Sequence, residues 1–286
     1  MANVRDLRRR IRSVKSIQQI TRAMKMVAAA RLRRAQERIL AARPYANKVQ
    51  QVMASLAARV DPEAHPLLAI RPQRRIVLAV ITADKGLCGS FNTNIHKRAI
   101  DFLRRHADGD LGLGLIGKKG RDFFRRRHWG VRFELIDLLR DLKLSDARAL
   151  AQRLAAPFIA GEIDAVYLVY NEFKSILQQR VVVERLLPIE RAELSGSTAP
   201  IDYIYEPGPA RIYAALLQTH LEVQLLRCLL ESAAAELGAR MSAMESATNN
   251  TVELISNLTL TMNKIRQAAI TTEIIEVSSG AEALAG

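Results

Sequence analysis

The sequence predicts an α/β fold with two long terminal helices. These helices are expected to form an antiparallel two-helix coiled coil, and a small central Rossmann-like α/β domain lies between them in the chain. Two heptad ladders near the ends of the 286-residue chain, and an alternation of short apolar runs with helical segments between them, predict this fold. A 3.5-residue repeat keeps one face of a helix against its partner as the two supercoil. The ladders are Leu32, Ala35, Ile39, Ala42, Ala46, Val49, Met53, Leu56, Val60 and Leu230, Ala234, Leu237, Met241, Met244, Thr248, Thr251, Ile255, Leu258, Met262, Ile265, Ala269, Thr272.

The first helix is expected over residues 3–58. Two consecutive three-residue steps after Val14 interrupt the heptad and predict local overwinding of the coil. Pro44 lies inside the apolar pattern, and because the pattern continues in phase beyond it, we expect a bend near residues 41–43 and no helix end there. The early apolar positions of this helix are Val4, Leu7, Ile11, Val14, Ile17, Ile20, Met24 and Val27.

The middle of the chain is expected to form the α/β domain, after a linker at residues 61–74 that contains three prolines. Short β-branched apolar runs are typical of buried strands, and strands that alternate with helices imply a parallel or mixed sheet. Ser145 is a candidate N-cap. The expected strands are Ile76–Ile81, Leu111–Ile116, Val131–Leu135, Ala165–Tyr170 and Arg180–Leu186, and the expected helices are Thr93–His106, Lys118–Arg127 and Ser145–Ile159.

The second terminal helix is expected from Ala210 to about Glu282. At 1.5 Å per residue it measures roughly 110 Å, against roughly 85 Å for the first helix, so it should extend past its partner. Its seam contains Thr248, Thr251 and Thr272, where a helix selected for stability alone would carry Leu. Small polar side chains reduce adhesion, which suits a surface that slides or turns against a neighbour. A fully solvated tip would explain the same pattern.

The formal net charge is +14 and the pI is about 10.3, values that are typical of nucleic-acid-binding proteins. Residues 1–43 carry thirteen Lys and Arg against two acidic residues, whereas residues 231–286 carry seven acidic residues against three basic ones. Opposite charge favours pairing of the two helices. Residues 1–44 contain no aromatic side chain, so the mixture of basic and aromatic residues that single-stranded nucleic-acid readers use is missing. A basic coiled-coil RNA- or ribosome-binding factor stays open as an alternative.

The chain shows no pattern for a membrane span, a secretion signal or a metal site. It has no run of eighteen apolar residues, and Asp6 together with the immediate heptad pattern argues against a transit peptide. We therefore expect a cytosolic protein, or one on a cytosol-facing surface. Cys88 and Cys228 lie 140 residues apart and the five histidines are scattered, which argues against a disulfide framework and against a zinc site.

Two segments could suggest an enzyme. The run from Gly112 through Gly114 to Gly117 matches GxGxxG, but these glycines lie within the expected strand, whereas a dinucleotide fingerprint follows a strand and opens a helix. With Lys118 the run nearly matches a Walker A loop, but Lys119 stands in place of its Ser or Thr. Glu134 lies twenty residues after Gly114, near the place of the acidic residue that binds the ribose in a dinucleotide fold. It is the one feature that favours a nucleotide-dependent enzyme, which is a third hypothesis.

The other segment, residues 86–92, offers Cys88 or Ser90 as a nucleophile. It has no GxSxG elbow and no local base, so a tight loop at the end of a strand is the preferred interpretation.

Three long segments carry a family resemblance: residues 20–36 (ITRAMKMVAAARLRRAQ), residues 83–92 (ADKGLCGSFN) and residues 239–284 (ARMSAMESATNNTVELISNLTLTMNKIRQAAITTEIIEVSSGAEAL). In this order they resemble the signature segments of the gamma subunit of the F-type ATP synthase. The similarity covers nearly the whole chain. The family more often has Ser-Asp-Arg-Gly where this chain has Ala83-Asp84-Lys85-Gly86.

The resemblance implies a non-catalytic central stalk, the rotor shaft of a proton- or sodium-translocating synthase that couples c-ring rotation to conformational change at the beta catalytic sites. It implies one copy per complex, with the alpha and beta subunits, the epsilon subunit and the c-ring as partners. It also implies no cofactor, no nucleic acid, and a peripheral place on the cytoplasmic face of the cell membrane, with membrane contact only through the c-ring.

The patterns along the chain divide it into residues 1–60 (coiled-coil helix), 61–74 (linker), 75–206 (central α/β domain) and 207–286 (coiled-coil helix). The resemblance implies the contact residues. No catalytic or metal-binding residue is implied. The implied beta-subunit contacts are Met24, Lys25, Arg266, Gln267, Thr271 and Glu273, and the implied c-ring contacts are Tyr203, Tyr205 and Glu206. Thr272 stands where many family members have Gln.

Overall fold

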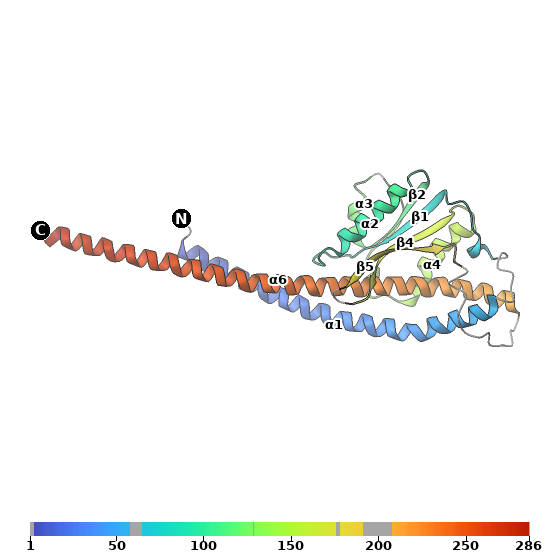
Figure 1. The fold of residues 1–286 in the computed structure, drawn as a ribbon, viewed down its shortest axis with the longest axis horizontal. Coiled ribbons are helices and arrows are strands. Elements are labelled where there is room, and N and C mark those ends of the chain that lie inside the picture. The colour runs from blue at the N-terminus through green and yellow to red at the C-terminus, as the bar shows by residue number, and fades with distance from the viewer. Residues whose placement is uncertain (1–2, 58–64, 128, 176–177, 191–207, 286) are drawn as a thin grey trace. The chain divides into compact units, whose positions relative to one another are not determined.

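The computed structural model describes residues 3–57, 65–127, 129–175, 178–190 and 208–285. Its two long helices are α1 (Val4–Ala57) and α6 (Pro209–Ala285), and a strand-rich region separates them in the chain (Figure 1). The chain divides into two compact units. We call residues 29–240 the body unit and residues 1–28 with 241–286 the tip unit. Each long helix contributes to both units.

The body unit contains one five-stranded sheet in the order β3-β2-β1-β4-β5. Its first four strands in this order are parallel, and β5 pairs antiparallel with β4. The strands β1 (Arg75–Ile81), β2 (Asp110–Ile116), β3 (Gly130–Leu135), β4 (Ala165–Phe173) and β5 (Gln179–Leu187) confirm the five that the apolar runs predict.

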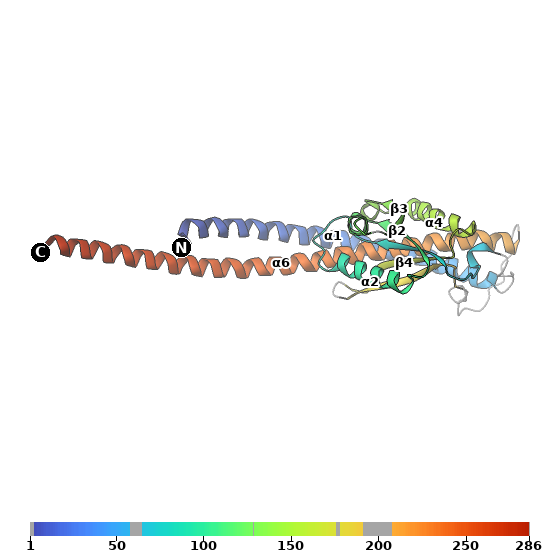
Figure 2. The same ribbon diagram turned by 90° about the horizontal axis from the view of Figure 1, so that it is seen from above.

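Helices cover both faces of this sheet, which is why its central strand is apolar at nearly every position. Figure 2 shows α2 (Phe91–Arg105) and α4 (Leu144–Ile159) on opposite sides of the sheet. In β1, Ile76, Leu78 and Val80 belong to one buried cluster, which includes residues of α2 and of α3 (Lys118–Phe124). The alternate residues of β1 belong to a second cluster, which includes residues of α4.

The second cluster also contains residues of both long helices. Met53 and Leu56 near the end of α1 are fully buried in it, as are Leu217 and Leu225 of α6. The heptad ladder predicted from Leu32 is buried or half-buried in the structure at every position from Leu32 to Leu56, while Val60 lies outside the described residues. The body unit is therefore a sheet with α2 and α3 on one face, and with α4 and parts of α1 and α6 on the other.

The structure differs from the sequence predictions at several helix ends. Helix α4 begins at Leu144, and its N-cap is Lys143, so the assignment of Ser145 as N-cap is wrong. The reason is Asp146, whose carboxylate accepts the backbone N–H of Lys143 at 2.9 Å and fixes the start of the helix one turn before it. Helix α1 runs through Pro44 without ending, as expected.

Part of the predicted linker packs against the body. Residues Pro66–Leu68 form a short 3₁₀ helix, and Leu67 and Leu68 are buried in the second cluster. The imidazole Nδ1 of His65 caps this turn by accepting the backbone N–H of Leu67 at 3.3 Å.

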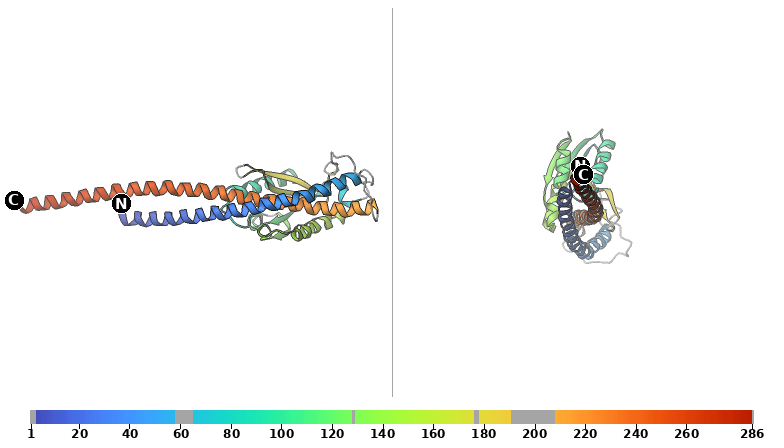
Figure 3. Two further views of the ribbon diagram at one scale, coloured as in Figure 1. Left: turned by 90° about the horizontal axis from the view of Figure 1, so that it is seen from below. Right: turned by 90° about the vertical axis from the view of Figure 1, so that its left-hand side faces the viewer.

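The tip unit consists of the first turns of α1 and the last turns of α6. Figure 3 shows these segments side by side, with the C-terminal end of α6 extending past the N-terminus of α1. Contacts from Thr21 to Thr248 and from Lys25 to Glu245 show that the two segments run antiparallel. Within the described chain, no helix combines the length and the apolar character that a membrane crossing requires.

Candidate functional site

The tip unit is the candidate functional site, because it holds six of the nine contact residues that the resemblance implies. A continuous heptad builds its seam. On α6, Met244 and Thr251 are buried and the other seam positions from Met241 to Ile265 are half-buried, which confirms this part of the predicted ladder. On α1, the buried and half-buried positions that follow the heptad are Val4, Leu7, Ile11, Val14, Gln18, Thr21, Lys25 and Ala28.

After Val14 the seam of α1 differs from the one that the apolar positions predict. The positions Ile17, Ile20 and Val27, expected inside the seam, are 47%, 58% and 52% exposed. We call these three residues the apolar stripe. The buried and half-buried positions follow one unbroken heptad through polar residues, so the two successive three-residue steps expected after Val14 are not part of the seam. The prediction of overwinding, which rested on those steps, is wrong.

Two polar contacts join the helices across this part of the seam. The hydroxyl oxygens of Thr21 and Thr248 lie 2.8 Å apart, and the ammonium of Lys25 pairs with the Glu245 carboxylate at 2.6 Å. The Thr248 hydroxyl also lies 2.7 Å from the carbonyl oxygen of Met244. Thr21 is only 8% exposed, so its hydroxyl needs such partners. Met24 is half-buried beside this polar seam.

The last turns of α6 carry the other four implied beta-contact residues. Every residue from Arg266 to Ala281 is exposed, including Gln267, Thr271 and Glu273. The prediction that Ala269 and Thr272 continue the seam is therefore wrong. The seam of α6 ends at Ile265 because its partner helix begins there. Thr21 faces Thr248, and Val4 lies as many residues before Thr21 as Ile265 lies after Thr248. The antiparallel partner thus begins opposite Ile265. The prediction that α6 outruns α1 is confirmed.

The three implied c-ring contacts, Tyr203, Tyr205 and Glu206, lie outside the described residues. Their assignment stays a prediction.

Neighbouring atoms of the protein fill the space beside the glycines of the GxGxxG match. A Cβ on Gly112 would lie 2.4 Å from the side chain of Arg132, and a Cβ on Gly114 would lie 2.3 Å from the ring of Phe133. At Gly117 it would lie 2.0 Å from the carbonyl oxygen of Thr82. These glycines admit neighbouring protein atoms, so the space that a pyrophosphate needs is already filled. Close packing explains the glycine run without a nucleotide.

The loop after β1 is a tight structural turn, as predicted. The side-chain amide of Asn92 bridges it, accepting the backbone N–H of Ala83 at 3.0 Å and lying 3.2 Å from the sulfur of Cys88. Arg240 of α6 donates to the carbonyl oxygen of Gly86 at 2.6 Å. Cys88 is 1% exposed, and burial raises the pKa of its thiol, so it is an inert packed residue and not a nucleophile. No group of three His, Cys, Asp or Glu residues within the described ranges could hold a metal ion.

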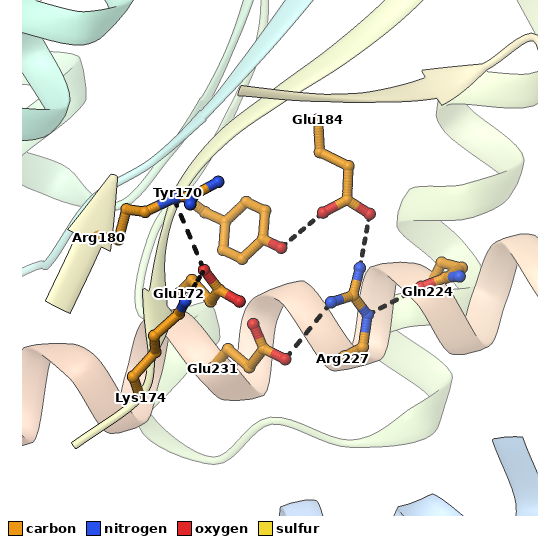
Figure 4. A network of polar contacts seen from close by, with 8 residues as sticks. All are labelled: Tyr170, Glu172, Lys174, Arg180, Glu184, Gln224, Arg227 and Glu231. Carbon is orange, nitrogen blue, oxygen red and sulfur yellow. Dashed lines mark hydrogen bonds and ion pairs between the residues drawn. The ribbon is translucent and has the colours of Figure 1, made fainter. Parts of the chain in front are cut away.

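A polar network joins α6 to the sheet in the body unit (Figure 4). Arg227 of α6 pairs with Glu184 of β5 at 2.5 Å and with Glu231 at 3.4 Å. The hydroxyl of Tyr170, on β4, donates to the second oxygen of Glu184 at 2.6 Å. Burial raises the pKa of Glu231, and Glu172 and Glu184 add to the effect while Arg227 opposes it. Arg227 is thus the cation that keeps two carboxylates together between α6 and β5.

Replacing Arg227 with Met is expected to lower the free energy of unfolding by about 2 kcal/mol, less than for a fully buried pair because Arg227 is part-exposed. Without Arg227 the pKa of Glu231 should rise further. A carboxyl whose folded pKa lies above its unfolded value loses its stabilising contribution as the pH rises, so the deficit should be larger at pH 8 than at pH 5. Urea unfolding at both pH values measures it. Arg33→Met, which breaks the exposed pair with Glu37, is the control and should change little. An equal deficit in both variants would contradict this role.

Comparisons with known proteins agree with this geometry. A family model described as ATP synthase matches residues 3–284. The chain is 53% identical to the ATP synthase gamma chain of Solibacter usitatus, with 99% of both chains covered. It is 50% identical to the gamma chain of an Anaeromyxobacter species, covering 99% of this chain and all of that one.

Two solved structures have a similar fold. One is the Tetrahymena thermophila mitochondrial ATP synthase central stalk and c-ring, with 27% identity, a TM-score of 0.61 and coverage of 80% of this chain and 99% of that one. The other is a chain of the Euglena gracilis mitochondrial ATP synthase, with a TM-score of 0.69 at 20% identity over 98% of this chain and 94% of that one. With a family match over nearly its full length and relatives of about half-identical sequence, the chain belongs to the gamma-chain family of the F-type ATP synthases.

Proposed function

We propose that this chain is the central rotor shaft of a proton- or sodium-translocating F-type ATP synthase. It is a non-catalytic subunit that couples rotation of the c-ring to conformational change at the beta catalytic sites. The observation that carries the proposal is the match to a gamma chain over 99% of both sequences, together with the match of residues 3–284 to the ATP synthase family model. The shape of the tip unit supports it, since a single helix end beyond a two-helix segment is asymmetric. A rotor must be asymmetric to place equivalent sites in different states.

The proposed partners are the alpha and beta subunits, the epsilon subunit and the c-ring, with one copy of this chain per complex. Residues 1–60 and 207–286 form the axle in this proposal, residues 75–206 form its base, and residues 61–74 connect the two. The complex places the chain peripherally at the cytoplasmic face of the cell membrane, where it takes part in ion transport through the c-ring. The alternative of an RNA- or ribosome-binding factor has no support among the relatives, which are named as gamma chains.

The proposed beta contacts fall on two surfaces of the tip unit. Arg266, Gln267, Thr271 and Glu273 are exposed on the final turns of α6. Met24 and Lys25 lie at the edge of the seam, and Lys25 keeps 37% of its side chain exposed while it pairs with Glu245. It can therefore face a partner without breaking that pair. Tyr203, Tyr205 and Glu206 are the proposed contacts with the c-ring.

Reconstitution with purified alpha and beta subunits tests the proposal. We expect the chain to co-purify with them and to raise their ATPase rate by at least about tenfold, which corresponds to about 1.4 kcal/mol in the activation barrier. Failure of the wild-type chain to join the alpha–beta assembly or to restore its ATPase would show that the proposal is wrong.

The same reconstitution tests the contact surface on α6. Arg266→Glu should lower the restored rate, because it reverses a charge at a proposed contact. Lys264→Glu is the matched control, since Lys264 is also exposed on α6 and makes the same charge change two residues earlier. Equal effects of the two variants would mean that Arg266 has no specific contact.

A further inference from the structure

Helix α1 offers two possible faces to α6 between Val14 and Ala28. One face carries Gln18, Thr21 and Lys25, and the other is the apolar stripe of Ile17, Ile20 and Val27 together with Met24. The faces are offset by one residue, so exchanging them requires a rotation of the helix by about 100° around its own axis. Burial of apolar side chains alone would favour the apolar stripe. The structure instead buries the polar face, so other interactions must decide the rotation.

The polar face makes contacts that the apolar stripe cannot make. In the observed rotation the Thr21 hydroxyl reaches Thr248 at 2.8 Å and the Lys25 ammonium reaches Glu245 at 2.6 Å. After the rotation, Ile20 and Met24 would occupy the places of Thr21 and Lys25. Neither side chain can donate a hydrogen bond, so Thr248 and Glu245 would lose their partners on α1.

The hydroxyl pair is part of a short hydrogen-bond chain. The Thr21 hydroxyl also lies 3.0 Å from the carbonyl oxygen of Gln18, and the Thr248 hydroxyl lies 2.7 Å from that of Met244. Each hydroxyl has a single proton and two lone pairs, so one threonine can donate to the other while the second donates to a carbonyl. Polar pairs inside an apolar seam are known to select one arrangement of a coiled coil at some loss of stability.

We propose that Thr21 and Lys25 are positioning residues which, through Thr248 and Glu245, fix the rotation of α1 against α6 and so keep the apolar stripe on the outside of the axle. The consequence for function rests on the proposed role as rotor shaft: the outward stripe, at 47–58% exposure, is then the apolar surface of α1 that meets the surrounding alpha–beta ring. Without the contacts of Thr21 and Lys25 to α6, the seam would bury the apolar stripe, and α1 would present polar residues to the ring.

Thiol labelling of the full-length chain tests this inference. One reporter, Ile20→Cys, lies on the apolar stripe, and a second, Gln18→Cys, lies on the polar face in a separate protein. The native Cys88 and Cys228 are buried, at 1% and 0% exposure, and so should not compete for a maleimide. In the otherwise wild-type chain, the thiol at position 20 should react at least about threefold faster than the thiol at position 18, because reaction follows exposure.

The decisive measurement combines each cysteine reporter with two substitutions on α6, Thr248→Val and Glu245→Ala. Substitutions on α1 itself are unsuitable, because an apolar residue at position 21 would favour the present rotation by burial. We expect this background to invert the ratio of the two labelling rates. The conservative background, Thr248→Ser with Glu245→Asp, keeps a hydroxyl and a carboxylate and should preserve the wild-type ratio.

Two results would overturn the inference. An unchanged ratio in the Thr248→Val, Glu245→Ala background would mean that heptad continuity alone sets the rotation. Faster labelling of both thiols would mean that the polar pairs only hold the helices together. The labelling needs no partner subunit, so its failure is separate from a failure of the wild-type chain to restore ATPase with alpha and beta.

Discussion

Gly117→Ala is expected to destabilise the body unit by at least about 3 kcal/mol, the scale of severe overpacking combined with backbone strain. Gly117 has a φ of +93°, a backbone conformation that residues with a side chain rarely adopt. Its new Cβ would lie 2.0 Å from the carbonyl oxygen of Thr82 and 2.8 Å from the Thr82 hydroxyl oxygen. Both the backbone and the neighbour would therefore have to change.

Thr82 cannot move away without breaking other contacts. Its backbone N–H donates to the carbonyl oxygen of Ile116 at 2.8 Å, and its hydroxyl accepts the backbone N–H of Gly120 at 2.8 Å. Gly117 itself donates to the carbonyl oxygen of Leu135 at 2.8 Å. These bonds tie the end of β1 to β2, β3 and the start of α3, so relaxation at Gly117 would disturb the centre of the sheet.

Urea unfolding followed by circular dichroism measures this effect. Gly86→Ala is the matched control, because the nearest heavy atom to its new Cβ is the Lys119 Cε at 3.8 Å, an ordinary contact, and its φ is not positive. We expect the control to keep the wild-type midpoint within experimental error. Equal midpoints for both variants would show that the turn at Gly117 relaxes freely, against the geometry of Thr82.

Asp164→Asn is expected to lower the free energy of unfolding by about 2 kcal/mol at pH 7, because it removes the charge of a buried, hydrogen-bonded carboxylate, while the exposure of its partner Arg75 reduces the effect below that of a fully buried pair. The Asp164 carboxylate is 5% exposed and pairs with the Arg75 guanidinium at 2.8 Å. It also accepts the backbone N–H of Arg75 at 2.8 Å and that of Arg74 at 3.2 Å. Asp164 therefore joins the start of β1 to the start of β4.

The pH dependence of this effect has a definite sign. The Arg75 side chain, with the backbone N–H groups, lowers the pKa of Asp164 below its ordinary value of 3.8, against the opposing effect of burial. A carboxyl with a depressed folded pKa contributes stability above its unfolded pKa and loses it as the pH falls through the folded value. The difference between wild type and Asp164→Asn should therefore be full at pH 7 and shrink below pH 3.8.

Unfolding curves for both proteins between pH 3 and pH 7 check this expectation. Asp110→Asn is the control at the same end of the sheet, because its side chain is 68% exposed and lies 3.8 Å from Arg132. Exposed pairs contribute little, so this variant should lose less than about 0.5 kcal/mol at any pH. A difference for Asp164→Asn that does not depend on pH would mean that packing, and not charge, explains its effect.

The amino-acid sequence by itself determined the type and order of the main elements. The strand β1 and its neighbours follow from local patterns, because a short, β-branched apolar run such as residues 76–81 is typical of a strand buried on both faces of a sheet. The long helices follow from the heptad period, and the extension of α6 past α1 follows from their unequal lengths. The proposed contact residues of α6 come from the family resemblance, and no periodicity identifies them.

The tertiary structure decided what depends on a partner segment. Periodicity could not choose between the faces of α1 that start at Ile17 and at Gln18, because the choice depends on Thr248 and Glu245, more than two hundred residues away. It could not tell that the seam of α6 stops at Ile265, because that limit is the start of α1. It could not show that Thr82 and Phe133 fill the space beside Gly117 and Gly114. The apolar repeat describes a single helix or strand. The rotation of α1, the length of the α6 seam and the space beside the glycines depend on pairs of elements that only the fold brings together.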